Sequence, residues 1–271
     1  MWWCTGAMTN RSAKFIFALV GCLLFASCST APEEGAVSSR AAPVSEADVP
    51  WSNTWSAAPE FDLLSRAGEL ARATVEGGVL AQGFGVEKSF PGYLDAIGGF
   101  PLPRYDDPRR KALAAAYAPP DLGPGAPDLK DRFYHIVDLT DDGSTVTAKV
   151  CTYTLAPTPS DMLKFLGKGH AVTLTRGDGP EGRPGIEDTG RNAKNIDGKI
   201  PDWNVYGSWQ ITESRGLRGA TLPSQCAPWF LSMFPDATFR SDINVVELPG
   251  LSPPASGKEQ YPKWIGPAAT E

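Results

Sequence analysis

Histidine is scarce in this chain, with His135 and His170 alone among 271 residues. A catalytic zinc site draws on histidine ligands and a serine hydrolase needs a histidine base, so both classes are disfavoured. Basic residues are outnumbered too, at 25 lysines and arginines against 31 acidic residues, for a net charge of −6. Because a nucleic-acid binder needs a basic surface to neutralise phosphates, we expect no nucleic acid among the partners.

Sequence motifs of several enzyme classes are missing as well. The chain contains no G-x-S-x-G, H-E-x-x-H, C-x-x-C or P-loop pattern. One G-x-G-x-x-G match covers residues 177–182, but Pro180 and Pro184 exclude the helix whose N-terminus would hold a pyrophosphate. The polar loop around it lacks the spacing and the closing glutamate of a calcium-binding EF-hand. We therefore expect no cofactor and no metal.

Long hydrophobic runs are limited to residues 15–26, which are too few for a membrane span of roughly 20 apolar residues. Arg11 and Lys14 precede this run and small residues follow it, which is typical of a secretory signal peptide. Met8 is an alternative start to Met1, because it leaves a conventional basic segment before the apolar run.

Residues 24–28, Leu-Phe-Ala-Ser-Cys, resemble a bacterial lipobox. That resemblance implies cleavage before Cys28, attachment of diacylglycerol to Cys28 and anchoring to the outer face of the cytoplasmic membrane, within the cell envelope. Two acyl chains hold a protein stably on a bilayer, since each buried methylene contributes about 0.8 kcal/mol. The alternative is an ordinary cleaved signal peptide without a lipid.

The composition along the chain predicts four regions. Residues 1–27 form the signal peptide with its lipobox, and residues 28–50, rich in small and polar residues, form a disordered tether. Residues 51–250 form an α+β domain, and residues 251–271 form a proline-rich C-terminal tail.

Cysteine counting predicts one disulfide. Of the five cysteines, Cys4 and Cys22 leave with the signal peptide and Cys28 takes the lipid, so Cys151 and Cys226 remain. We expect these two to pair, because an exported domain folds in an oxidising compartment. The alternative is a pair of buried free thiols.

The first part of the domain has a helical pattern. Apolar residues over 63–75 recur at helical spacing, which predicts a helix from Pro59 to the glycine pair at 77–78. A short helix is expected near residues 91–97, and a third over 107–117.

Beyond residue 130 the hydrophobic period changes to two. Residues 133–139 and 146–152, joined by Asp-Asp-Gly, predict a β-hairpin. Further strands are expected at 171–176, 205–211 and 243–248, with a helical turn at 160–166 and a short helix at 227–234.

Helices followed by an antiparallel sheet define an α+β fold. This order, with Trp209 in the late segment Val-Tyr-Gly-Ser-Trp-Gln-Ile, resembles the NTF2-like (SnoaL-like) family over about residues 60–248. The chain is also similar to envelope lipoproteins of actinobacteria of the mycobacterial type. The NTF2-like resemblance implies N-terminal helices packed on a curved, mainly antiparallel sheet that encloses a cone.

Five side chains are candidates for lining such a cone: Tyr134, His135, Asp138, Tyr153 and Trp209. If the domain is an enzyme, the resemblance to NTF2-like isomerases and hydratases implies a buried acid with a tyrosine or histidine partner inside the cone. Strand alternation places Tyr134 and Asp138 on one face and His135 on the other, so the five cannot all meet. The sequence favours a non-catalytic module that binds an apolar small molecule or an envelope protein, with a small-pocket enzyme as the alternative.

Overall fold

A computed structural model describes residues 45–46, 49–98, 131–155, 165–166, 168–189, 198–242, 245–247 and 259–267. Residues from Arg40 to Glu271 form one compact unit, and residues 1–39 form another, which lies outside the described ranges. The predicted signal peptide, Cys28, most of the predicted tether and the predicted helix over 107–117 also lie outside them.

The main sheet has five strands. These are β1 (Ser52–Ala57), β2 (Asp131–Asp141), β3 (Thr145–Leu155), β5 (Lys168–Arg176) and β6 (Trp209–Arg218), in the spatial order β1-β2-β3-β5-β6. β1 runs parallel to β2, and the other neighbours are antiparallel. The predicted hairpin is confirmed in β2 and β3, whose turn holds Gly143 at a φ of 83° that favours glycine.

Helices and a small second sheet complete the α+β fold. The helical segments are α1 (Arg66–Phe84), η2 (Val86–Lys88), α2 (Tyr93–Ala96), η3 (Gly219–Thr221) and α4 (Cys226–Met233). The second sheet has the order β4-β8-β7 and contains β4 (Phe165–Leu166), β7 (Thr238–Arg240) and β8 (Val245–Glu247). Within the described ranges, no helix is both long and apolar enough to cross a membrane.

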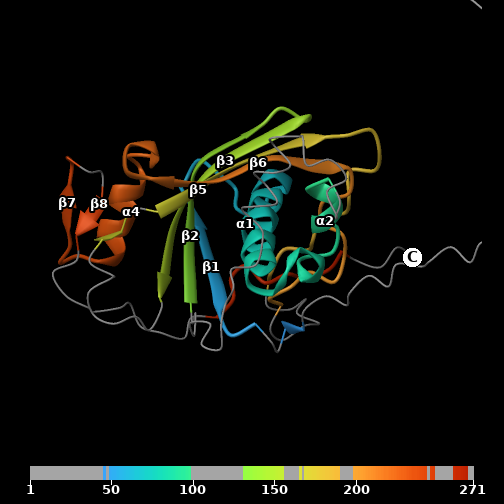
Figure 1. The fold of residues 1–271 in the computed structure, drawn as a ribbon, viewed down its shortest axis with the longest axis horizontal. Coiled ribbons are helices and arrows are strands. Elements are labelled where there is room, and N and C mark those ends of the chain that lie inside the picture. The colour runs from blue at the N-terminus through green and yellow to red at the C-terminus, as the bar shows by residue number, and fades with distance from the viewer. Residues whose placement is uncertain are drawn as a thin grey trace, which may run out of the picture. The chain divides into compact units, whose positions relative to one another are not determined.

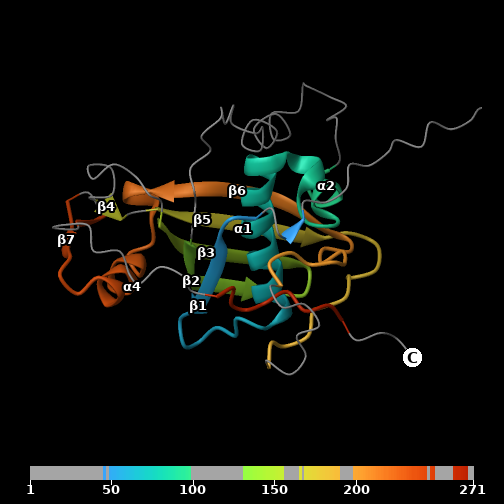
Figure 2. The ribbon, with the colours of Figure 1, turned by 90° about the horizontal axis from the view of Figure 1, so that it is seen from below.

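α1 and α4 cover opposite faces of the main sheet (Figures 1 and 2). Along β2, Tyr134 and Ile136 pack in one apolar cluster with Val75 of α1, whereas Phe133 packs in another with Phe230 of α4. This division follows from the alternation of side chains along a strand. The sheet therefore has apolar layers on both sides, in agreement with the predicted α+β class.

α1 begins and ends later than its sequence pattern predicts. The Ser65 hydroxyl caps the helix by accepting a hydrogen bond from the Gly68 N–H at 3.1 Å, so the helix starts at Arg66. The helix continues through Gly77 and ends at Gly85, where φ is 99°. The predicted stop at the glycine pair is therefore wrong, because glycine at 77 serves a packing role inside the helix.

That packing role is a close approach to two tyrosine rings. A Cβ at position 77 would lie 2.7 Å from Tyr93 Cδ2 and 3.0 Å from Tyr206 Oη. Glycine lowers helix propensity by about 1 kcal/mol relative to alanine, but it lets Tyr93 and Tyr206 reach the helix backbone.

We predict that Gly77→Ala destabilises the domain by about 1–3 kcal/mol, because the added methyl overpacks this contact. Gly83→Ala is a matched control in the same helix, since a Cβ there would meet only Trp51 Cη2 at an ordinary 3.8 Å. The control should be neutral or stabilising by up to about 1 kcal/mol. Urea denaturation of both variants checks this, and equal effects at the two glycines would contradict it.

Segments at both ends of the domain differ from the predictions. β1 was not predicted, and the strand expected at 205–211 begins only at Trp209. Residues 259–267, assigned to the tail by composition, pack along the outer edge of β1, where the Trp55 N–H donates to the Tyr261 carbonyl at 2.8 Å. Because Trp264 is buried, this C-terminal segment belongs to the core.

Candidate functional site

The five side chains predicted to line a cone do not share a pocket. Tyr134 and Trp209 are buried on the face that α1 covers. His135 and Tyr153 lie on the face that α4 covers, where His135 stacks on Trp229 at 5.3 Å. The expected separation of Tyr134 from His135 is therefore confirmed.

Asp138 lies on the opposite face from the one predicted. The register of β2 against β3 shifts between Ile136 and Asp138, which inserts Val137 as an extra residue and reverses the alternation. Asp138 then faces Lys149 of β3, and their charged groups are 2.6 Å apart at the surface. The prediction that Tyr134 and Asp138 share a face is wrong for this reason.

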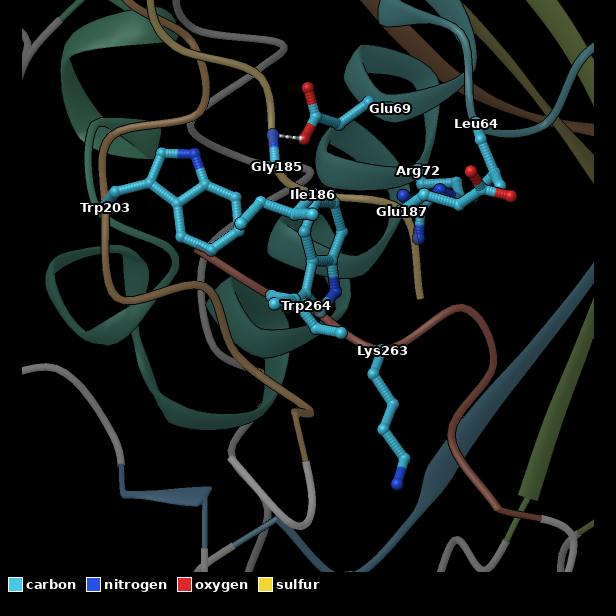
Figure 3. Close-up of a pocket in the computed structure, with 10 residues that line it drawn as sticks. Leu64, Glu69, Arg72, Gly185, Ile186, Glu187, Trp203, Lys263 and Trp264 are labelled. Atoms are coloured by element: carbon cyan, nitrogen blue, oxygen red, sulfur yellow. Dashed lines mark hydrogen bonds between the residues drawn. The ribbon is translucent and has the colours of Figure 1, made fainter. Parts of the chain in front are cut away.

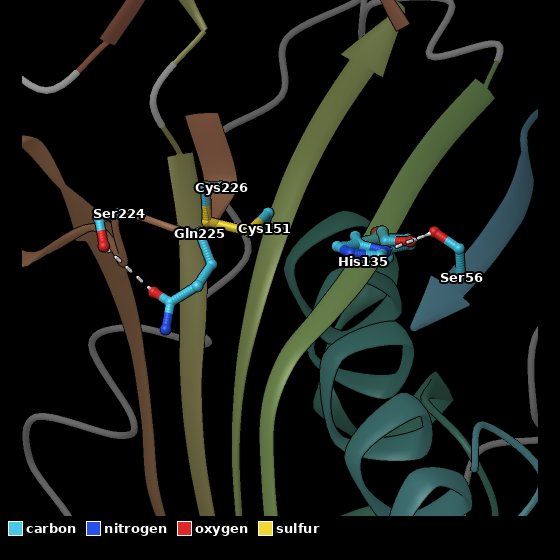
Figure 4. Close-up of a disulfide and its surroundings, with 7 residues drawn as sticks. Ser56, His135, Cys151, Ser224, Gln225 and Cys226 are labelled. Atoms are coloured by element: carbon cyan, nitrogen blue, oxygen red, sulfur yellow. Dashed lines mark hydrogen bonds between the residues drawn. A yellow bond between two sulfur atoms is a disulfide. The ribbon is translucent and has the colours of Figure 1, made fainter. Parts of the chain in front are cut away.

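On the α4 face, the predicted disulfide between Cys151 and Cys226 is present (Figure 4). It joins β3 to α4 across 75 residues of sequence, and both cysteines are fully buried. Beside it, His135 Nδ1 lies 2.8 Å from Ser56 Oγ. Burial lowers the pKa of His135, and the charge of Glu60 opposes this shift. The imidazole is thereby favoured in its neutral form.

On the α1 face, a fully buried carboxylate binds three distant parts of the chain together. Trp55 Nε1 donates to Glu76 Oε1 at 2.7 Å. Asn53 Nδ2, Trp264 Nε1 and Gln260 Nε2 donate to Oε2 at 3.0, 2.8 and 3.5 Å. Since these donors come from β1 and from the C-terminal segment, Glu76 of α1 fastens both to the helix. We call these five residues the Glu76 cluster.

Burial of Glu76 also alters its acidity. It raises the pKa of Glu76 to about 7, although the Arg72 charge and the N–H donors of Trp264, Trp55 and Asn53 act in the opposite direction. In the unfolded chain a glutamate has a pKa of about 4.5. Between pH 4.5 and pH 7, Glu76 is therefore mostly protonated in the folded state and mostly ionised in the unfolded state.

This difference predicts a pH-dependent stability. Because the folded pKa of Glu76 is the higher one, its contribution is largest below pH 4.5 and is lost as the pH rises through 7. The loss amounts to about 3 kcal/mol, from about 1.4 kcal/mol per pKa unit. Burial lowers the pKa of His170 to about 4, which gives the opposite trend at acidic pH.

Comparison with Glu76→Gln isolates this titration from that of His170. Urea denaturation at several pH values should show the stability of the wild type falling relative to the variant by about 3 kcal/mol between pH 4.5 and 8. A difference that stays constant over this range would contradict the assignment.

Arg72 lies one helical turn before Glu76 and is likewise buried, at 4% exposure. Its guanidinium stacks on the Trp264 indole, with 4.5 Å from Cζ to the ring centre. Burial lowers the pKa of Arg72, and the charges of Glu76 and Glu69 raise it. Among the residues that the structure describes, neither Nε nor Nη1 of Arg72 has a hydrogen-bond partner.

Glu69 is the second acid on this side of α1, and its oxygens are already bound. The Gly185 N–H donates to Oε1 at 2.6 Å, and Arg66 Nη1 donates to Oε2 at 2.5 Å. Arg66 Nη2 also donates to the carbonyls of Glu181 and Val205. These bonds anchor the loop after β5 and the segment before β6 to the start of α1.

Between that loop and the C-terminal segment lies a cleft of about 40 Å³ that reaches Arg72 (Figure 3). The cleft is lined by Leu64, Glu69, Arg72, Gly185, Ile186, Glu187, Trp203, Lys263, Trp264 and Ile265. We call it the Arg72 cleft. In Figure 3 the Lys263 ammonium points away from the other lining side chains, so Arg72 is the cation that lies within it.

The Arg72 cleft combines a cation with apolar walls. Arg72 supplies N–H donors, while Trp203, Ile186 and Leu64 supply apolar walls. In the described part of the chain, no group of three or more histidine, cysteine or acidic residues could hold a metal ion. Sequence patterns did not reveal the cleft, because its lining comes from four segments spread between Leu64 and Ile265.

Comparison with known protein families, with curated proteins and with solved structures gives no match to this chain. A functional assignment therefore depends on the sequence features at the N-terminus and on the geometry described above.

Proposed function

We propose that the chain is an exported, lipid-anchored protein of the cell envelope whose α+β domain is a non-catalytic binding module. The disulfide between Cys151 and Cys226 is the observation that supports export most directly, because structural disulfides belong to proteins that fold outside the cytoplasm. The lipobox at residues 24–28 supplies the anchor. The proposed partners are the membrane, through the lipid, and a small molecule or an envelope protein, through the domain.

Two features of the interior support binding rather than catalysis. The space between α1 and the sheet contains large packed side chains, including Trp55 stacked on Tyr134 at a ring distance of 4.4 Å. The oxygens of the buried acid Glu76 are occupied by N–H donors. An acid–base catalyst instead needs its carboxyl group within reach of a substrate proton.

An NTF2-like relation is part of the proposal for the fold. α1 packed across one face of a mainly antiparallel sheet supports it. β1 departs from the expected order of helices followed by a sheet, because it precedes α1 and pairs in parallel with β2. An isomerase- or hydratase-type enzyme is the alternative function, favoured by the raised pKa of Glu76.

Replacement of the lipobox cysteine tests the anchor. In an exporting bacterial host we expect the wild-type protein in the detergent phase after membrane extraction, and Cys28→Ala in the aqueous phase. Cys22→Ala is the matched control, because Cys22 leaves with the signal peptide and its loss should change nothing. Equal partition of the wild type and Cys28→Ala would contradict lipid anchoring.

A further inference from the structure

The charge on Arg72 is opposed by nearby acids, yet its Nε and Nη1 have no hydrogen-bond partner among the residues that the structure describes, which is unusual for a buried guanidinium. The two acids that oppose its charge, Glu69 and Glu76, accept from other donors in the structure. A buried donor without an acceptor destabilises a fold unless a ligand or a water molecule satisfies it. Nε and Nη1 of Arg72 therefore have unused hydrogen-bonding capacity, and Arg72 is one of the residues that line an open cleft.

The size of the Arg72 cleft limits what can satisfy that capacity. Its 40 Å³ corresponds to about three water-sized spheres of 10–15 Å³, so a group of about three heavy atoms fits. The guanidinium carbon of Arg72 lies over the Trp264 indole, 4.5 Å from the ring centre, and the guanidinium is itself planar. A planar acceptor such as a carboxylate suits this arrangement, because guanidinium and carboxylate groups pair in a common plane.

The apolar walls determine where the rest of a ligand would lie. Trp203 packs edge-on against Trp264 at 6.2 Å, and Leu64, which is 36% exposed, lies at the mouth. An uncharged, apolar substituent would contact these side chains on its way out of the cleft. The exposed Glu187 at the rim opposes anionic ligands and therefore limits the affinity.

We propose that the Arg72 cleft binds the carboxylate group of a small organic acid or of a peptide C-terminus. The inference rests on the proposed binding role of the domain but not on the lipid anchor. Loss of carboxylate binding would leave detergent partition unchanged, and loss of the anchor would leave carboxylate binding unchanged, so the two failures are distinguishable.

The test is titration of the purified full chain with sodium acetate, followed through the indole N–H resonance of Trp264. We expect saturation with a Kd on the order of 1 mM, because one small group meets one guanidinium. Acetamide and chloride at equal concentration should leave the resonance unchanged. Hexanoate and N-acetylalanine represent the two sources of the carboxylate, and the tighter of the two identifies the source.

Three variants make the test specific to the cleft. Arg72→Lys keeps the charge but loses the planar donors, and should weaken acetate binding at least tenfold. Glu187→Gln removes a repulsive charge from the rim, and should tighten binding by about threefold. Glu213→Gln, which changes a half-buried acid on β6 outside the cleft, is the control and should have no effect.

Three results would overturn the proposal. They are a Trp264 resonance that does not respond to acetate, an equal response to phosphate or chloride, and unchanged binding in Glu187→Gln. The last variant keeps the test valid if Arg72→Lys fails to fold, because Glu187 is exposed. A crystal structure that shows only ordered water beside Arg72 at 0.1 M acetate, about 100 times the expected Kd, would also overturn it.

Discussion

Replacement of Glu76 by alanine is expected to destabilise the domain by about 3–5 kcal/mol at pH 7. The variant leaves the N–H donors of Asn53, Trp55 and Trp264 buried without their acceptor. It also removes the carboxylate that acts most strongly on the charge of Arg72. Because the donors belong to β1 and the C-terminal segment, both should detach from α1 together. Chemical denaturation measures the loss of stability, and hydrogen exchange of the Trp264 indole measures the detachment.

Two further variants calibrate this result. Glu76→Gln keeps one acceptor oxygen, so its loss should be smaller, at about 1–3 kcal/mol. Glu213→Ala, which removes a half-buried acid that pairs with Arg215 and accepts from Thr173, should cost about 1 kcal/mol at most. A loss below about 1 kcal/mol in Glu76→Ala would show that the Glu76 cluster does not hold these segments together.

Removal of the disulfide is expected to have an effect of similar size on the other face of the sheet. The double variant Cys151→Ala/Cys226→Ala frees a loop with a sequence separation of 75 residues. Loop-closure entropy alone predicts a loss of roughly 4.5 kcal/mol. The loss should be measured by urea denaturation, and hydrogen exchange should show α4 opening before α1.

The wild-type protein supplies a control for this prediction. Both cysteines have no exposed surface, so a mild reductant should leave the folded protein oxidised and should act only after unfolding. Equal stability of the double variant and the wild type would contradict the role assigned to the disulfide. Loss of α1 protection at the same time as α4 protection would contradict its restriction to one face.

Local patterns in the sequence predicted the elements that depend on local chemistry. The β2–β3 hairpin followed from strict alternation and an Asp-Asp-Gly turn, and α4 followed from its short apolar run. The pairing of Cys151 with Cys226 followed from counting, because the other three cysteines were predicted to be removed or lipidated. Each of these predictions needed only a pattern of neighbouring residues or a count of the cysteines in the chain.

Features that depend on contacts distant in sequence were not predictable. The bulge at Val137 changes the face of Asp138, and alternation alone carries no sign of it. Gly77 suggested a helix end, because its tyrosine partners lie elsewhere in the chain. In the Glu76 cluster, Glu76 bonds to Trp264, which lies 188 positions away, and no sequence pattern links the two. The Arg72 cleft depends on the same long-range contacts.

Native mass spectrometry of the wild-type chain extracted from membranes tests the central claim most directly, namely that a lipid-anchored domain holds a small acid. The account predicts a polypeptide that begins at a diacylated Cys28 and that, with a small organic acid supplied in excess over its Kd, carries this acid non-covalently; the acid is released on denaturation and is lost in Arg72→Lys. A polypeptide without lipid and without a bound acid in wild-type spectra would contradict it.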